Sequence, residues 1–584
     1  MDEAPLHHTK TTLAHGFLLL ASVGAVSGFA ASGLPASSRA PSAAPSAPHS
    51  SARIARRGRA APTTATAGRG GSSTPSVTAA GMSAARAAAE LRQRFRSGAT
   101  RPYAWRRQQL EGVIRMLTEC EDELIAAVCK DTGKPPEEMR LSEVTQTLCA
   151  ARLMVRSLRG WMADERFASW GILFPSTPTI RHEPHGVVLM IAPFNFPLML
   201  ILKPLLGAVA AGNCVLVKPS EACPETSALV ARLFPQFLDA QSIRVFEGAV
   251  PETQALLAER WDFVCFTGSQ RVGRLVAKAA AEHMTPCLLE LGGKNVAIVD
   301  QEVHSLAVVA RRLLWGRFIN AGQSCVAPDV VVCVGAAQAA ALKAAMLDCY
   351  RSFYGGDPRR SPDFGRLVTP AAARRVQQLL QGTDVGDVLV GGEADPEDRY
   401  VAPTILWETP ASSKLMREEI FGPVLSVVTV PTVDDAIRYT DSITRDPLAL
   451  YVFSSRKTET QRILAAIPSG GAVVNDCMVH QGLPHLPFGG RGLSGLGTYH
   501  GRYSFETFSQ KRTILYKHGN RDHPLLDFWI RYPPGDGAKA LIITFLARNL
   551  PFLPSGVASV IKALVLVAPG VVGLWLYLKG RLLL

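Results

Sequence analysis

Three side chains in this sequence could act together on a carbonyl carbon: a cysteine, a glutamate and an asparagine. Cys325 lies in FINAGQSCVAPD, residues 318–329, between small and polar residues. Such flanks predict exposed backbone beside a thiol, and a thiolate is a good nucleophile toward carbonyl carbon. One cysteine among 11 is more often a small buried apolar residue than a nucleophile. The assignment of Cys325 therefore depends on the groups that accompany it.

The glutamate and the asparagine each follow an apolar run. Glu290 lies in LLELGGKN, residues 288–295, where a carboxyl group could have the raised pKa that a general base needs. A buried structural glutamate is the alternative. Asn195 lies in APFNFPL, residues 192–198, directly after a continuously apolar stretch. Its carboxamide can donate to an oxyanion, although this stretch taken alone favours an ordinary turn asparagine.

Two further segments suit a dinucleotide. One strand pattern leads into KPSE, residues 218–221, where a ribose hydroxyl could bond the carboxylate of Glu221. A solvated charged loop is the alternative there. Phe263 to Phe266 leads into TGSQRVG, in which Gly268 and Gly273 open an Ala-rich helix. A helix N-terminus after a strand suits a pyrophosphate, although the spacing is neither GxGxxG nor a P-loop.

Alternating helices and strands are expected to position these groups. Residues 82–161 have helical periodicity, with Leu110, Val113 and Leu117 among the apolar positions. Short runs at 170–180 and 186–191 predict strands, and Val187 to Ala192 is apolar throughout, as in a strand buried on both faces. The pattern predicts an α/β fold with its sites beyond the strand ends.

Composition limits the class of protein. The length of 584 residues allows two or three domains, and 47% hydrophobic with 19% charged residues indicates a folded chain. The 11 cysteines show neither a CxxC pair nor Cys/His metal spacing, which predicts reduced thiols and no metal site. The formal charge is +13, but the basic excess lies near the two ends. We therefore predict no nucleic-acid partner.

Both ends depart from globular composition. Residues 1–84 contain an apolar run, Phe17 to Ala31, and then a Ser/Ala/Pro/Arg tract without acidic residues. This order resembles a two-part targeting presequence for plastids, which we favour over an endoplasmic reticulum or mitochondrial leader.

At the other end, residues 540–584 are predicted to be a membrane anchor. Ala563 to Leu578 carries no charge, and Trp575 and Tyr577 lie close to Lys579. The uncharged run of about 16 residues is short of the ~20 that a spanning helix needs, so the segment either spans the membrane or lies in its interface. A buried core helix is the alternative.

As a set, the motifs resemble the aldehyde dehydrogenase superfamily over about residues 85–517. The motifs FNFP, KPSE, FTGS, ELGGK, GQSC, EEIFGP and PFGG occur in that family's order. VPET, CVAPD, PLALYVFSS, VVND and YHGRYSFETFS are similar to its fatty aldehyde branch, which often carries a hydrophobic C-terminal tail.

The resemblance implies an α/β fold, a homodimer and a domain plan. Its parts are a Rossmann-type NAD-binding domain at 85–290 with a bridging hairpin at about 165–185, a catalytic domain at 291–480, a bridging return segment at 481–517, a linker at 518–539 and the anchor at 540–584.

It also implies a role for each candidate residue. Cys325 would be the nucleophile, Asn195 with the Cys325 N–H the oxyanion hole, and Glu290 the base that activates water. NAD, with NADP possible, would be held by Lys218, Glu221, Gly268, Ser269, Gly273, Leu291, Glu419 and Phe421.

The implied reaction is NAD(P)-dependent oxidation of medium-chain, long-chain or lipid-derived aldehydes to acids through an acyl-cysteine. Two alternatives stay open. A coenzyme A-acylating dehydrogenase is disfavoured by Glu290, and a catalytically silent membrane protein on the same fold is disfavoured by the presence of Cys325, Asn195 and Glu290 together.

Overall fold

The computed structural model describes residues 82–169 and 176–517, together with a few positions between 532 and 548. Nearly all of the predicted presequence, most of the predicted linker and the anchor from residue 549 onward lie outside the described residues. Among the helices of the described residues, none is long and apolar enough to cross a membrane.

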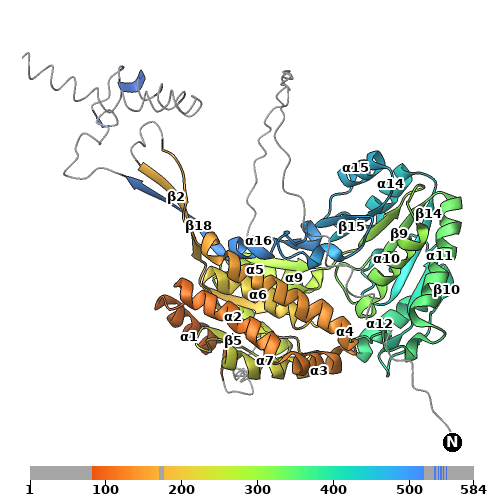
Figure 1. The fold of residues 1–584 in the computed structure, drawn as a ribbon, viewed down its shortest axis with the longest axis horizontal. Helices are drawn as coiled ribbons and strands as arrows, with labels where there is room; N and C mark the ends of the chain where they lie inside the picture. The colour runs from red at the N-terminus through yellow and green to blue at the C-terminus, as the bar shows by residue number, and fades with distance from the viewer. Residues whose placement is uncertain are drawn as a thin grey trace, which may run out of the picture. The chain divides into compact units, whose positions relative to one another are not determined.

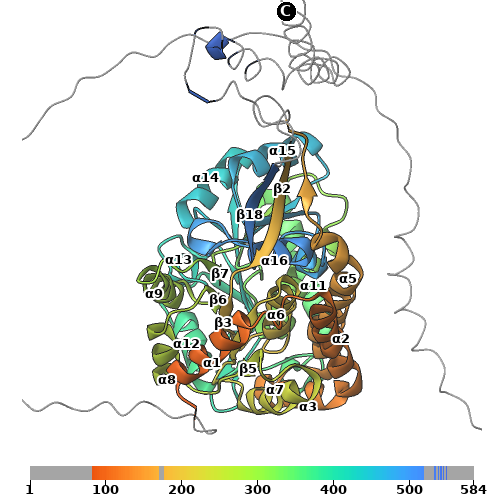
Figure 2. The same cartoon turned by 90° about the vertical axis from the view of Figure 1, so that its left-hand side faces the viewer.

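The first of two large sheets carries the segments that were expected to bind a dinucleotide (Figures 1 and 2). Its five longer strands are parallel, and a short sixth strand pairs antiparallel at one edge. In spatial order the strands are β17 (Gly495–Leu496), β7 (Cys287–Leu291), β6 (Phe263–Gly268), β3 (Val187–Ile191), β4 (Cys214–Lys218) and β5 (Ile243–Val245). The crossovers run through α6 (Met199–Ala211), α7 (Pro224–Phe237), α8 (Val250–Ala258) and α9 (Gln270–Ala281). Every residue of β3 is buried, as predicted for a strand covered on both faces.

The helical pattern before this sheet is confirmed, divided into several helices. These are α1 (Ala84–Arg96), α2 (Tyr103–Glu119), α3 (Glu121–Thr132), α4 (Pro136–Met139), a π-helix (Arg140–Thr145) and α5 (Gln146–Trp161). The apolar positions Leu110, Val113 and Leu117 are buried. Helices α2 and α5 pack on each other and on α6 (Figure 2), so that α6 is buried on all sides.

The second sheet is also mainly parallel. Its strands, in spatial order, are β10 (Asp387–Val390), β13 (Thr404–Trp407), β14 (Val424–Val430), β9 (Val330–Val334), β8 (Val296–Val299), β15 (Ala449–Phe453) and β16 (Gly471–Val474). Alternate residues of β8 and β9 join different apolar clusters. One cluster includes residues of α10 (Leu306–Phe318) and α11 (Ala336–Tyr354), the other residues of α14 (Val433–Ile443) and α15 (Lys457–Ala466).

The chain passes from the first sheet to the second between Leu291 and Val296, beside the boundary expected at 290. The domain limits themselves stay a prediction. A third, small sheet joins β1 (Glu165–Arg166), β2 (Ser176–Pro184) and β18 (Ser509–Lys517). Strands β2 and β18 pair antiparallel along their whole length, which places the segment at 165–185 beside the end of the predicted return segment (Figure 1).

Candidate active site

A cavity of about 310 Å³ lies beyond the carboxyl ends of β3, β6 and β7. Cys325, Asn195 and Glu290 all line it, although they are up to 130 positions apart in the chain. The nucleophile, oxyanion and base candidates therefore share one cavity at the edge of the sheet where α/β proteins keep their sites.

The loop that carries Cys325 takes an uncommon path after α10. Asn320, Ala321 and Gly322 adopt left-handed conformations in succession, with φ of 53°, 49° and 75°. A Cβ on Gly322 would lie 2.2 Å from the carbonyl oxygen of Gly422, so only glycine fits there. This turn directs the chain from the end of α10 to the cavity.

The prediction of exposed backbone around Cys325 was wrong. Gln323 and Ser324 are only 2% and 3% exposed. The Gln323 amide donates to the Asn320 and Arg366 carbonyls and accepts from the Val368 N–H, so its polarity serves buried hydrogen bonds. Cys325 itself stays half-buried because it borders the cavity.

Asn295 fixes the far side of the Cys325 loop, and sequence reasoning gave it no role. Its Nδ2 donates to the carbonyl oxygens of Cys325 (2.7 Å) and Ala327 (3.0 Å), and its Oδ1 accepts from the Ala449 N–H (2.9 Å). The Tyr451 hydroxyl donates to the next carbonyl in the loop, that of Val326. These bonds hold three successive carbonyl groups and so fix the thiol relative to the second sheet.

Replacing Asn295 with alanine is expected to lower kcat by about a hundredfold, because a shift of about 1 Å in the nucleophile is enough for such a loss. Dinucleotide affinity should change little, since Asn295 does not line the cavity. Steady-state kinetics and a dinucleotide titration measure the two effects. Asn213→Ala is the matched control: this buried asparagine bonds the backbone of Gly186, Ala208 and Phe508, none of which lines the cavity, and its loss should lower Tm while kcat is retained.

The turn that carries Asn195 is supported by a buried ion pair. Lys134 Nζ lies 2.7 Å from Glu143 Oε1 and donates to the Asn195 carbonyl oxygen at 3.3 Å. Glu143 Oε2 accepts from the N–H groups of Leu198 (2.9 Å) and Met199 (3.1 Å), where α6 begins. A carboxylate suits these free N–H groups at a helix N-terminus. Asn195 Nδ2 donates to the Gln323 carbonyl (3.1 Å), which leaves its second proton available.

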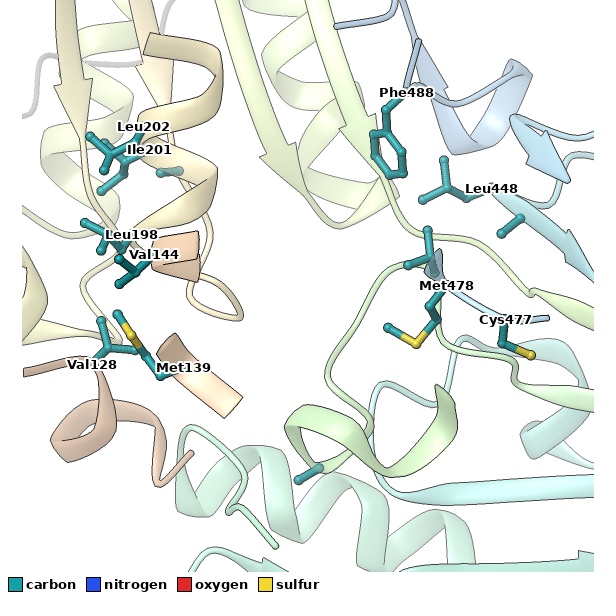
Figure 3. Close-up of a cluster of buried hydrophobic side chains, with 14 of the residues drawn as sticks. Val128, Met139, Val144, Leu198, Ile201, Leu202, Leu448, Cys477, Met478 and Phe488 are labelled. Atoms are coloured by element: carbon teal, nitrogen blue, oxygen red, sulfur yellow. The ribbon is translucent and has the colours of Figure 1, made fainter. Parts of the chain in front are cut away.

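Apolar packing also supports the turn that carries Asn195. Figure 3 shows Leu198 close to Val144 of the π-helix, with Met139 and Val128 beyond them. All four side chains are at most 1% exposed. The π-helix places both Glu143 and Val144 against the start of α6, and so contributes a polar and an apolar contact to the support of this turn.

Burial dominates the electrostatics of the reacting groups. Both carboxyl oxygens of Glu290 are buried and without a hydrogen-bond partner, and this burial raises the pKa of Glu290 well above its ordinary value. Burial, followed by the nearby Glu419 and Glu290, raises the pKa of Cys325 to about 12. The Cys325 thiol therefore holds its proton at neutral pH in this state, and Glu290 keeps its proton to higher pH than an ordinary glutamate.

The part of the cavity expected to hold the cofactor contains five of the predicted residues: Gly268, Ser269, Leu291, Glu419 and Phe421. Ser269 caps α9, whose N-terminus therefore opens on the cavity. Burial, then Asp329, raises the pKa of Glu419 to about 8, and its Oε1 has no hydrogen-bond partner. The ring of Phe421 meets that of Phe194 edge-on at 5.8 Å.

Three predicted cofactor residues do not line this cavity. Lys218 is buried at the end of β4, and its Nζ lies 2.5 Å from Glu221 Oε2. Gly273 packs against Leu291, where an added Cβ would lie 2.5 Å from a methyl carbon, so its place is at the helix–strand contact. Arg375 of α12 (Pro370–Leu380) does line the cavity, and no motif in the sequence pointed to it.

In the described part of the chain, no group of three or more His, Cys, Asp and Glu residues could hold a metal ion. All 11 cysteines are free. The cavity thus offers a thiol, a carboxamide and a carboxyl group, next to a second region lined by glycines and a helix N-terminus.

Comparison with known proteins adds an independent finding. The model of the aldehyde dehydrogenase family matches residues 63–514. The chain is 40% identical over 471 residues to aldehyde dehydrogenase family 3 member I1, chloroplastic, of Arabidopsis thaliana, which covers 80% of this chain and 84% of that protein. The matched range includes Asn195, Glu290 and Cys325.

Two solved structures are similar. One is the substrate-bound state of Staphylococcus aureus AldH, at 36% identity and a TM-score of 0.75, covering 79% of this chain and 99% of that chain. The other is the Mycobacterium tuberculosis aldehyde dehydrogenase complexed with NAD+, at 26% identity and a TM-score of 0.67, covering 74% of this chain and 90% of that chain.

Proposed function

The chain belongs to the aldehyde dehydrogenase family, and from this premise we propose how its residues carry out the reaction. The enzyme oxidises aldehydes to carboxylic acids with NAD, and NADP is possible. The observation that carries the assignment of roles is the meeting of Cys325, Asn195 and Glu290 on one cavity.

The residues present fit a dinucleotide. A Cβ on Gly292 would lie 2.0 Å from the Glu419 carboxylate, so glycine keeps that approach open. The free Glu419 Oε1 can accept from a ribose hydroxyl, and the N-terminus of α9 suits a pyrophosphate. Lys218 and Glu221 are proposed to hold the adenosine ribose, and a carboxylate there favours NAD over NADP because a 2′-phosphate would be repelled.

The reaction begins with attack of the Cys325 sulfur on the aldehyde carbon. The thiol first gives its proton to solvent water, and the thiolate then forms the S–C bond while the carbonyl oxygen becomes an alkoxide. The free proton of Asn195 Nδ2 and the N–H of Cys325 stabilise this charge. NAD, when held by these residues, would supply the acceptor for the hydride. Loss of that hydride from the carbon leaves an acyl thioester on Cys325.

Glu290 completes the cycle. Its carboxylate takes a proton from a water molecule, whose oxygen attacks the thioester carbon, and the C–S bond breaks to release the acid and the Cys325 thiolate. The unpartnered carboxyl oxygens suit this role because nothing in the described structure competes for the proton.

The activity is tested by following NADH formation with hexanal and identifying the product. Free hexanoic acid, formed without any added thiol, is the expected result. A product that appears only with coenzyme A would instead support the acyl-transferring reaction, and no NADH with any aldehyde would support a silent protein on this fold.

Medium-chain, long-chain or lipid-derived aldehydes are the proposed substrates, since a hydrophobic tail would place the enzyme where they partition. The presequence composition and the similarity to a relative named chloroplastic support a plastid location. The exposed Leu515 and Tyr516 of β18 and the exposed Phe167 support pairing of this small sheet in a homodimer.

Deleting residues 540–584 is expected to move the enzyme from the membrane pellet to the soluble fraction, because the deletion removes the uncharged apolar run. Fractionation of cells that express the full and shortened chains measures this. Aldehyde oxidation should survive the deletion, since the described cavity lies within residues 193–421. Continued pelleting of a folded, active shortened chain would contradict the anchor.

A further inference from the structure

A second cavity borders Cys325. Its accessible volume is only about 10 Å³, the space of one water molecule, and Phe196, Met199, Leu200 and Phe488 give it apolar walls. Gln481, Lys203, Tyr499 and His500 also line it. None of these eight residues lines the cofactor cavity, so Cys325 has the proposed dinucleotide region on one side and this small cavity on another.

The unusual member of this set is Lys203. It lies within α6, where every residue is buried, and it is itself only 4% exposed. Its Nζ donates to Gln146 Oε1 (3.1 Å) and to the carbonyl oxygen of Gln481 (3.3 Å), both of them neutral groups. Within the described residues Lys203 forms no ion pair, and burial lowers its pKa to about 8. A buried ammonium without a counter-charge is costly, and one of its three protons is still free.

The two neighbouring histidines, His480 and His500, cannot balance the positive charge of Lys203. Burial lowers the pKa of His500 well below its ordinary value, with Lys203 and His480 adding to the effect, and burial lowers that of His480 to about 4. Both rings are therefore neutral near pH 7. His500 is 5% exposed and its Nδ1 has no hydrogen-bond partner, although the residue lines the cavity. One proton of Lys203 Nζ and the Nδ1 of His500 thus have no hydrogen-bond partner in the cavity that Cys325 also lines.

Given the proposed function, on which this inference rests, we propose that the enzyme prefers aldehydes that carry a carboxylate. Lys203 binds this carboxylate, and His500 provides a second polar contact. An anion at Lys203 would neutralise the one uncompensated charge of this cavity. A free Nδ1–H on His500, in the tautomer that carries its proton there, could donate to the same group.

The size of the cavity limits the substrate further. Lys203, His500 and Cys325 all line this one small cavity, so we expect a short chain between the carboxylate and the aldehyde carbon. The void of about 10 Å³ holds a single water molecule, so its walls must move apart to admit the substrate. Oxidative cleavage of an unsaturated acyl chain produces fragments with an aldehyde at one end and a carboxyl group at the other. Carboxylate-bearing aldehydes therefore remain compatible with a lipid origin.

The test compares aldehydes of equal length with and without the carboxylate: 4-oxobutanoate against butanal, and 6-oxohexanoate against hexanal. For each pair the readout is the ratio of the two kcat/KM values, with NAD and the full chain. The wild type should favour the acid by about tenfold or more in at least one pair, the size expected for a charge-assisted hydrogen bond. K203M should lower that ratio about tenfold, and K203R should largely keep it.

Lys457→Met is the matched control, because Lys457 is an exposed lysine at the start of α15, and its ratio should equal that of the wild type. A wild-type preference for the alkanals in both pairs, or an unchanged ratio in K203M, would overturn the proposal. Should K203M fail to fold, competitive inhibition of the wild type by succinate or adipate against the alkanal decides, and absence of inhibition counts against it. No NADH with any of the four aldehydes would instead refute the proposed function.

Discussion

Cys325→Ser is expected to reduce kcat for aldehyde oxidation by about 10,000-fold or more. The hydroxyl of serine is a much weaker acid than a thiol, and the buried site already raises the pKa of Cys325 to about 12. NADH formation at saturating aldehyde measures the loss. Dinucleotide binding should persist, because the residues proposed to hold NAD are unchanged.

The controls separate loss of chemistry from loss of structure. Cys149→Ser changes an exposed thiol and should retain full activity. For Cys325→Ser, a Tm within a few degrees of the wild type and an unchanged NAD titration would show that the fold is intact. Activity above a tenth of the wild-type value in the serine variant would remove Cys325 from the nucleophile role.

Glu290→Gln is expected to separate the two halves of the reaction. Hydride transfer does not need the Glu290 carboxylate, so a burst of about one NADH per active site should remain. Hydrolysis does need it, and steady-state turnover should fall by about 100- to 1,000-fold, the usual contribution of a general base. Stopped-flow recording of NADH measures both phases. Equal loss of the burst and of the steady state would mean that Glu290 acts in an earlier step.

The dependence of this second phase on pH follows from the burial of Glu290. Its pKa is raised, so the carboxylate form appears at higher pH than in an ordinary glutamate and becomes more abundant as pH rises. Steady-state turnover limited by hydrolysis should therefore increase with pH, over a range above that in which an ordinary glutamate titrates. The measurement uses an alkanal so that Lys203 is not engaged. The residual turnover of Glu290→Gln should lack this dependence, because an amide does not titrate in this range.

The sequence was sufficient to predict the kind of fold and to name the candidate reacting residues, which the structure brings to one cavity. Apolar runs such as Val187 to Ala192 predicted buried parallel strands because both faces of such a strand must be covered. Cys325, Asn195 and Glu290 could be named because each stands next to short motifs whose order along the chain is itself informative. Short stretches of sequence are enough for these two predictions, because the apolar pattern of a strand and the residues of a motif both lie close together in the chain.

Tertiary structure alone decided what surrounds those residues. Sequence reasoning placed Cys325 in exposed backbone, but Gln323 and Ser324 are buried, and the Gln323 amide bonds the backbone of Arg366 and Val368, far along the chain. No motif indicated the roles of Asn295, the Lys134–Glu143 pair or Lys203, because each acts through contacts with distant residues. Burial, and with it the pKa values of Cys325 and Glu290, depends on how the two sheets enclose the cavity, which no stretch of sequence contains by itself.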